Sequence, residues 1–330
     1  MIFYPSILAL LSGSFLTVFI LLYACWYGTQ ILRRWDIASG SELQLGLERR
    51  TYLISTIMSY ALGFQLLSLF LFIYTADRLA TLFSGAMCAA GTLNVNAWGY
   101  PTLLLKIVNA LMAGIWLIVN STDNSAVDYP LIRKKYALLL PLTLLLCAEA
   151  VFQTAYFLGL SPDIITSCCG TLFSAASGES SPILTISWPT AAAAFYTLSA
   201  LAIVSGLGVY LRGKGIWLFS LSSAGLFVAS SIALIVYISP YIYELPTHHC
   251  PFCILHAEYY FVGYLLYIAY LAGGITGIGA GVISVFSGIP SLRETLPHIS
   301  RELALVSLIA WIVSLCVSAG WIIFSNLRMS

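Results

Sequence analysis

Residues 216–239 read IWLFSLSSAGLFVASSIALIVYIS, a run without a single charged side chain. An α-helix needs about 20 apolar residues to cross the hydrocarbon core of a bilayer, and only helices or closed barrels satisfy their backbone groups there. Similar runs lie near 6–32, 52–76, 102–120, 137–160, 190–211, 257–285 and 303–325. The sequence therefore predicts an all-α polytopic membrane bundle of about eight transmembrane helices.

The composition supports this class. Of 330 residues, 60% are hydrophobic and 8% are charged, whereas a soluble domain has roughly 25% charged residues. A net charge of +1 leaves no basic patch to neutralise phosphates, so we expect membrane lipid and no nucleic acid as a partner. No hydrophilic domain interrupts the runs, and residues 1–330 are predicted to form a single transmembrane domain.

The basic residues predict an orientation. They gather in the odd-numbered connections, as Arg33, Arg34, Arg49, Arg50, Arg133, Lys134, Lys135, Arg212, Lys214, Arg293 and Arg301. Cytoplasmic loops carry the excess of Lys and Arg, so both termini are expected on the outer side. In a bacterium this is the inner (cytoplasmic) membrane, with the even-numbered connections facing the periplasm.

The predicted outer segments, 77–101, 161–189 and 240–256, carry most of the cysteine and histidine. We expect them to form one Cys/His-rich outer cap, containing Cys88, Cys168, Cys169, His248, His249, Cys250, Cys253 and His256. In the oxidising periplasm thiols are paired, catalytic or metal-bound. Cys25, Cys147 and Cys316 fall within the runs, where small apolar packing residues are expected.

The densest chemistry is the stretch HHCPFCILH at 248–256. Cys-x-x-Cys at the start of a helix is a redox or metal arrangement, because the helix N-terminus stabilises a thiolate and the spacing lets two sulfurs bond or share an ion. His256, one turn past Cys253, is expected to face the same way. A static disulfide, a redox pair and a metal site remain open. A copper or zinc site would draw on His248, His249, Cys250, Cys253, His256 and Cys88.

The adjacent pair Cys168–Cys169 has two interpretations. Neighbouring cysteines rarely bond to each other, so one sulfur would exchange with the Cys250–Cys253 pair and the other with an outside thiol, or they would ligate a metal with Cys88. The surrounding segments echo each other, CAAGTL at 88–93 and CCGTL at 168–172. Residues 1–136 are therefore a candidate degenerate copy plus flanking helices.

Charged residues within the runs are scarce. Lys106 lies near the outer end of the third run and Glu149 lies in the fourth. Intramembrane ionisable residues mark functional sites by default. The two residues would help to bind a quinone head group, or would form an ion pair that locks two helices.

The region 137–285 resembles the vitamin K epoxide reductase and DsbB-type family of four-helix membrane oxidoreductases, which pass electrons from protein thiols to a quinone. The residues that carry the resemblance are SCCGTLFS at 167–174, the Trp188-Pro189 that opens the next run, and Cys250-Pro251-Phe252-Cys253 two runs later. In that family the two loop cysteines are several residues apart, whereas Cys168 and Cys169 are adjacent.

The resemblance implies a four-helix thiol-redox core at 137–285. Cys250 and Cys253 would be the active-site pair, Cys168 or Cys169 the loop shuttle, and Ser174 would lie near the quinone. A periplasmic thioredoxin-like protein is expected to supply the thiols. The family does not have the flanking His248, His249 or His256, so it is from their place beside the thiols, and not from the resemblance, that we expect His256 or His249 to tune thiolate pKa and move protons. The alternative function is a non-catalytic metal- or cofactor-binding subunit of a respiratory or assembly complex.

Overall fold

The computed structural model describes residues 3–36, 39, 41–161, 164–166 and 185–328. Throughout these residues the regular structure is helical, and eight helical segments are long and apolar enough to cross a membrane. The chain is thus an all-α, multi-pass membrane protein, as the sequence predicts. The principal helices are α1 (Pro5–Arg34), α2 (Glu42–Leu79), α4 (Gly99–Asn124), α5 (Ile132–Leu158), α6 (Trp188–Arg212), α7 (Ile216–Ala233), α9 (Val262–Ser284) and α10 (Thr295–Phe324).

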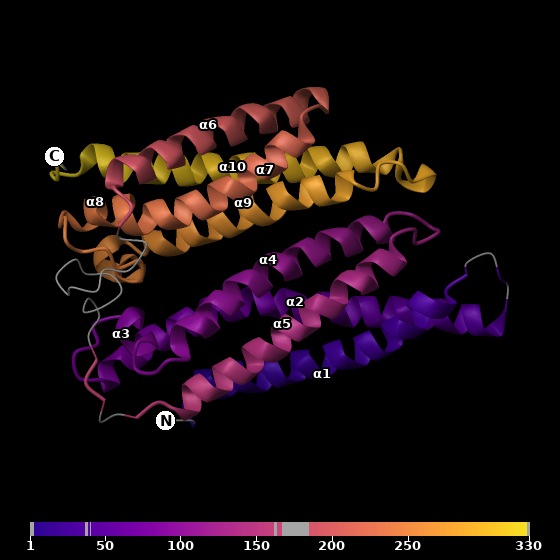
Figure 1. Cartoon of the computed structure of the whole chain (residues 1–330), viewed down its shortest axis with the longest axis horizontal. Coiled ribbons are helices and arrows are strands. Elements are labelled where there is room, and N and C mark those ends of the chain that lie inside the picture. The colour runs from indigo at the N-terminus through magenta and orange to yellow at the C-terminus, as the bar shows by residue number, and fades with distance from the viewer. Residues whose placement is uncertain (1–2, 37–38, 40, 162–163, 167–184, 329–330) are drawn as a thin grey trace. The chain divides into compact units, whose positions relative to one another are not determined.

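The chain divides into two compact units. Unit 1 comprises residues 1–75, 96–160 and 285–298. In it, α5 packs against both α1 and α4, and most of α2 belongs to the same bundle (Figure 1). Its core is built from large side chains such as Tyr27, Met58, Trp116 and Tyr136, all at most 2% exposed.

Unit 2 comprises residues 76–95, 161–284 and 299–330. In it, α7 packs against both α6 and α9, and α10 lies in the same bundle (Figure 1). The packing is close, because a Cβ atom at Gly273 of α9 would lie 2.6 Å from the Trp311 ring of α10. The segment 137–285 therefore contains most of α5 of unit 1 and all of α6, α7 and α9 of unit 2.

The sixth span is interrupted near one end. After α7 the chain makes a π-helical turn, Leu234–Ile238, and continues as α8 (Ser239–Tyr243). The N–H of Ser239 bonds the carbonyl of Leu234, five residues back. In this register the carbonyl of Ile235 would pair with residue 240, which is Pro240 and has no N–H. Nδ1 of His249 lies 3.0 Å from that carbonyl oxygen and donates to it instead.

The seventh span begins later than the sequence predicts, at Val262 rather than 257. Residues Cys253–Leu255 and Ala257–Tyr259 form separate 3-10 turns, and Tyr260 and Phe261 have left-handed φ angles of 54° and 55°. The prediction that Cys-x-x-Cys begins the long helix, with His256 one helical turn past Cys253, is therefore wrong. The backbone of His256 is extended, at φ −83° and ψ 161°.

Candidate functional site: a three-sulfur cluster

Three cysteine sulfurs meet in unit 2. Sγ of Cys88 lies 3.4 Å from Sγ of Cys250, and these two atoms and Sγ of Cys253 all lie within 4.8 Å of one another. A separation of 3.4 Å is too long for a disulfide, whose bond is about 2.05 Å. Cys88 and Cys250 are fully buried, and Cys253 is partly exposed. We call this group the three-sulfur cluster.

Cys88 is held by the backbone on either side of it. It has an extended conformation immediately before the short helix α3 (Ala89–Leu93). The N–H of Ala89 donates to Oδ1 of Asp77 at 3.2 Å, and the N–H of Gly91 donates to the carbonyl of Cys88 at 3.0 Å. The hydroxyl of Thr166 donates to the carbonyl of Gly91 at 2.9 Å. Hydrogen bonds on both sides thus fix the backbone at Cys88.

Two tyrosine hydroxyls hold the Cys-Pro-Phe-Cys turn. The hydroxyl of Tyr243 donates to the carbonyl of Cys250 at 2.5 Å, and that of Tyr267 donates to the carbonyl of Pro251. Tyr243 ends α8 and Tyr267 lies in the second turn of α9, so the turn is tied to both neighbouring spans. The sequence did not identify either tyrosine, because both lie outside the 248–256 stretch in which the cysteines and histidines stand out.

An acidic residue joins the two sides of the cluster. Oδ1 of Asp77 lies 2.9 Å from Nε2 of His256 and also accepts the N–H of Ala89. Asp77 lies in the last turn of α2, one residue before Arg78. Sequence reasoning missed it because the orientation rule counts basic residues only. Asp77 lies in the first of the three predicted outer segments, and all three carry cysteine. An acidic residue in such a segment was the sequence feature that could have identified it.

The electrostatics favour a protonated thiol at the centre of the cluster. The hydrogen bond with Cys253 raises the pKa of the Cys250 thiol, and burial adds to this, while the hydrogen bond with Cys88 acts in the opposite direction. Because the net shift is upward, Cys250 is a thiol rather than a thiolate at neutral pH. Cys253 is the least buried residue of the three.

The predicted histidines take other roles around the cluster. Within the described ranges, the group of mutually close ligand atoms contains the three sulfurs and no imidazole nitrogen. His249 bonds Ile235, and His256 bonds Asp77. The ring of His248 packs edge-on against Tyr243, and burial lowers its pKa, so it is neutral.

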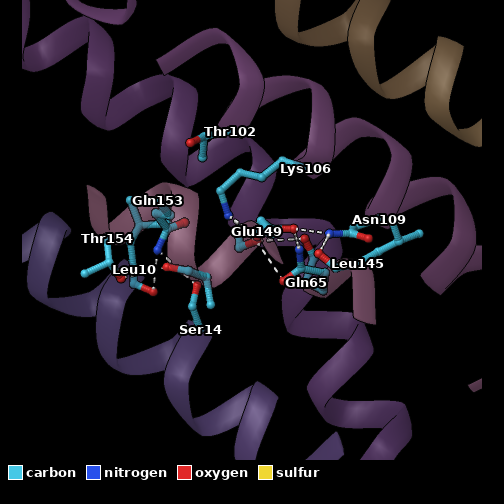
Figure 2. Close-up of polar contacts among 12 residues, drawn as sticks. Leu10, Ser14, Gln65, Thr102, Lys106, Asn109, Leu145, Glu149, Gln153 and Thr154 are labelled. Carbon is cyan, nitrogen blue, oxygen red and sulfur yellow. Dashed lines mark hydrogen bonds and ion pairs between the residues drawn. The ribbon is translucent and has the colours of Figure 1, made fainter. Parts of the chain in front are cut away.

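Lys106 and Glu149 meet in unit 1. Nζ of Lys106 lies 2.7 Å from Oε1 of Glu149, and both side chains are essentially unexposed. Figure 2 shows the amide nitrogens of Gln65 and Asn109 directed at the same carboxylate, at 2.5 and 2.6 Å from Oε2. With both its oxygens bonded, Glu149 joins α2, α4 and α5. The ion pair between two helices is confirmed, and the quinone-binding role stays a prediction.

A second buried pair lies on the same two helices. Nζ of Lys135 lies 2.7 Å from Oδ2 of Asp123 and 3.0 Å from Oδ1 of Asn120, and Lys135 is 0% exposed. The orientation prediction counts Lys135 as one of three basic residues in the third connection. It is instead neutralised inside unit 1, while Arg133 and Lys134 are exposed.

The remaining predicted residues, Cys168, Cys169 and Ser174, lie outside the described residues. Just before them, the N–H of Thr166 donates to the carbonyl of Ser84 at 3.0 Å, in the segment that precedes Cys88. No protein-family model, curated protein or solved structure matches this chain.

Proposed function

We propose that this protein is a membrane thiol–disulfide oxidoreductase that passes electrons from protein thiols to a membrane quinone through Cys250 and Cys253. The observation that supports the proposal most strongly is the 3.4 Å separation between Sγ of Cys88 and Sγ of Cys250, beside Sγ of Cys253. Exchange requires a thiolate to approach a disulfide sulfur closely, and a third sulfur beside a Cys-x-x-Cys pair meets this requirement.

The chemistry starts from a Cys250–Cys253 disulfide. A thiolate of a substrate dithiol attacks Sγ of Cys253, the S–S bond breaks, and Cys250 leaves and takes up a proton. The second substrate thiol, once deprotonated, attacks the mixed disulfide and releases Cys253, so that the substrate is oxidised and the pair is reduced. Two electrons and two protons then pass to the quinone, which becomes a hydroquinone as the disulfide re-forms. Cys253 is the point of entry because it is the less buried of the two.

Cys88 would stand behind the pair as an internal exchange partner. Its sulfur lies 3.4 Å from that of Cys250, and the residue is fully buried. Electrons would therefore pass to and from Cys88 by exchange within the cluster. The loop cysteines Cys168 and Cys169 would carry electrons in from a periplasmic thioredoxin-like protein, as the family resemblance implies.

The test is a count of reactive thiols in the purified, detergent-solubilised protein. The reduced protein is mixed with a soluble quinone, quenched in acid, and labelled with a mass tag. We expect Cys250 and Cys253 to lose their label together as one equivalent of hydroquinone forms. Cys250→Ser should abolish the reaction, because Cys250 is the neighbour of both Cys253 and Cys88. Cys147→Ala, which changes a cysteine in α5, should not. If both thiols keep their label in excess quinone, the proposal fails.

The proposed orientation, with the cluster on the periplasmic face of an inner membrane, has its own test. A membrane-impermeant maleimide is added to intact bacterial cells and to inverted membrane vesicles. Labelling of the exposed end of unit 2, at a cysteine introduced at Tyr260, is expected in cells only. The side chain of Tyr260 is 82% exposed, so a cysteine there reports the side without entering the cluster. Labelling in vesicles only would place the cluster on the cytoplasmic side.

A further inference from the structure

The three-sulfur cluster has the form of a metal site as well as that of a redox pair. Three sulfurs that hold one ion at about 2.3 Å lie about 4 Å from one another when they surround it in a plane. The sulfurs of Cys88 and Cys250 are 3.4 Å apart, somewhat closer than this, and no two of the three sulfurs are more than 4.8 Å apart. An ion could therefore enter with shifts of well under an ångström at each sulfur.

The fold, and not closeness in the sequence, brings Cys88 to the other two cysteines. Cys88 and Cys250 are 162 residues apart in the chain. The Cys88 segment is tied through Ala89 to Asp77, and the Cys250 turn is tied to Tyr243 and Tyr267. None of these bonds uses a sulfur atom. A site whose ligands are already held in place loses little conformational entropy on binding.

The ligand set indicates which ion fits. Thiolate sulfur is a soft ligand that selects Cu(I), zinc or iron–sulfur clusters, and disfavours magnesium and calcium. Structural zinc is almost always held by four protein ligands, and the described group supplies three. Cu(I) is satisfied by two or three sulfurs. Two of the three are 0% exposed, which keeps water away from the ion and favours the monovalent state.

We propose that Cys88, Cys250 and Cys253, in their reduced state, form a three-sulfur site for one monovalent copper ion. Binding replaces the thiol protons with the metal and requires no oxidant. It does not depend on the proposed oxidoreductase activity, although it uses the same cysteines. A Cys250–Cys253 disulfide would withdraw two of the three ligands, so oxidation would release the ion.

The test uses full-length protein in detergent, reduced and kept anaerobic, with Cys168 and Cys169 changed to serine so that only the described outer cysteines count. Cu(I) is supplied from a competing chelator. We expect about one equivalent to bind, with three sulfur neighbours at about 2.3 Å by X-ray absorption at the copper edge. Zn²⁺ is titrated in parallel in the same background and should bind more weakly.

Matched variants decide the assignment. Loss of a residue that only supports a metal ligand weakens metal binding by roughly 10- to 100-fold. Cys88→Ser removes a ligand itself and should weaken Cu(I) binding by more than this. Cys316→Ala is the control and should leave Cu(I) binding unchanged. Cys253→Ser, at a less buried position, repeats the test if Cys88→Ser does not elute as a single species. Unchanged binding in both serine variants, a nitrogen–oxygen coordination shell, or tighter Zn²⁺ binding would overturn the proposal.

The outcome is separable from that of the proposed function. Cys88→Ser removes a copper ligand but leaves the Cys250–Cys253 pair able to form a disulfide with quinone. Copper binding that fails while quinone oxidises the pair contradicts only the metal site. Copper binding that succeeds while the pair never oxidises contradicts only the oxidoreductase.

Discussion

Oδ1 of Asp77 lies 2.9 Å from Nε2 of His256, at the end of α2 and immediately after the Cys253 turn. The same oxygen accepts the N–H of Ala89, the residue after Cys88. One carboxylate thus joins the two segments that carry the sulfurs. We therefore expect Asp77 to be a positioning residue for either chemistry proposed for the cluster.

Replacing Asp77 with asparagine should loosen the cluster. Asparagine keeps the size of the side chain but loses the charge that strengthens both bonds, at a cost of about 1–2 kcal/mol for this partly exposed pair. A cost of that size makes the open form about 5–30 times more populated. We expect Cys88 to react with maleimide faster by the same factor. Glu258→Gln, an exposed acid two residues after His256, is the control, and equal rates in both variants would contradict the role of Asp77.

The two buried lysines of unit 1 should be far more sensitive than their neighbours. Lys135→Met leaves Asp123 as an uncompensated buried charge and should lower the stability of the detergent-solubilised protein by about 3–5 kcal/mol. Lys134, next to it, is exposed and lies over the ring of Phe286, 4.4 Å from its centroid. Lys134→Met should cost about 1 kcal/mol or less. Thermal unfolding of the two variants side by side tests the contrast, which similar melting temperatures would refute.

The Lys106–Glu149 pair offers a way to separate structure from cofactor binding. Lys106→Met alone leaves the buried Glu149 carboxylate without its counter-ion. It should lower the stability of the protein by about 3–5 kcal/mol. Adding Glu149→Gln removes the charge, keeps an acceptor for Gln65 and Asn109, and should restore part of the loss.

We expect the Lys106→Met/Glu149→Gln variant to be oxidised by quinone at the wild-type rate, because the carboxylate oxygens are already occupied by protein donors. Stopped-flow measurement of thiol oxidation checks this. A stable double variant with a much higher quinone requirement would instead support the quinone-binding role predicted from the sequence.

Apolar run length was sufficient to predict the fold, because crossing a bilayer imposes a length and a composition that a single sequence displays directly. It could not predict where α9 begins, since Tyr260 and Phe261 are apolar and give no sign of their left-handed backbone. Cysteine spacing identified Cys250 and Cys253. Its place in a predicted outer segment added Cys88 to the candidate metal ligands. The 3.4 Å approach of its sulfur to Cys250 depends on contacts between segments 162 residues apart, which spacing does not encode.

The bond between His249 and Ile235 yields a prediction in which a second substitution repairs the first. His249→Ala leaves the carbonyl of Ile235 without a donor, because the π-helical register assigns it to Pro240. A fully buried carbonyl left unsatisfied costs about 1–3 kcal/mol, and this partly buried one should cost about 1 kcal/mol. Pro240→Ala supplies the missing N–H, so the double variant should be more stable than His249→Ala alone. A metal-binding role for His249 would give no such rescue. Thermal unfolding of the wild type, both single variants and the double variant measures the coupling, and strictly additive losses would show that His249 does not serve this carbonyl.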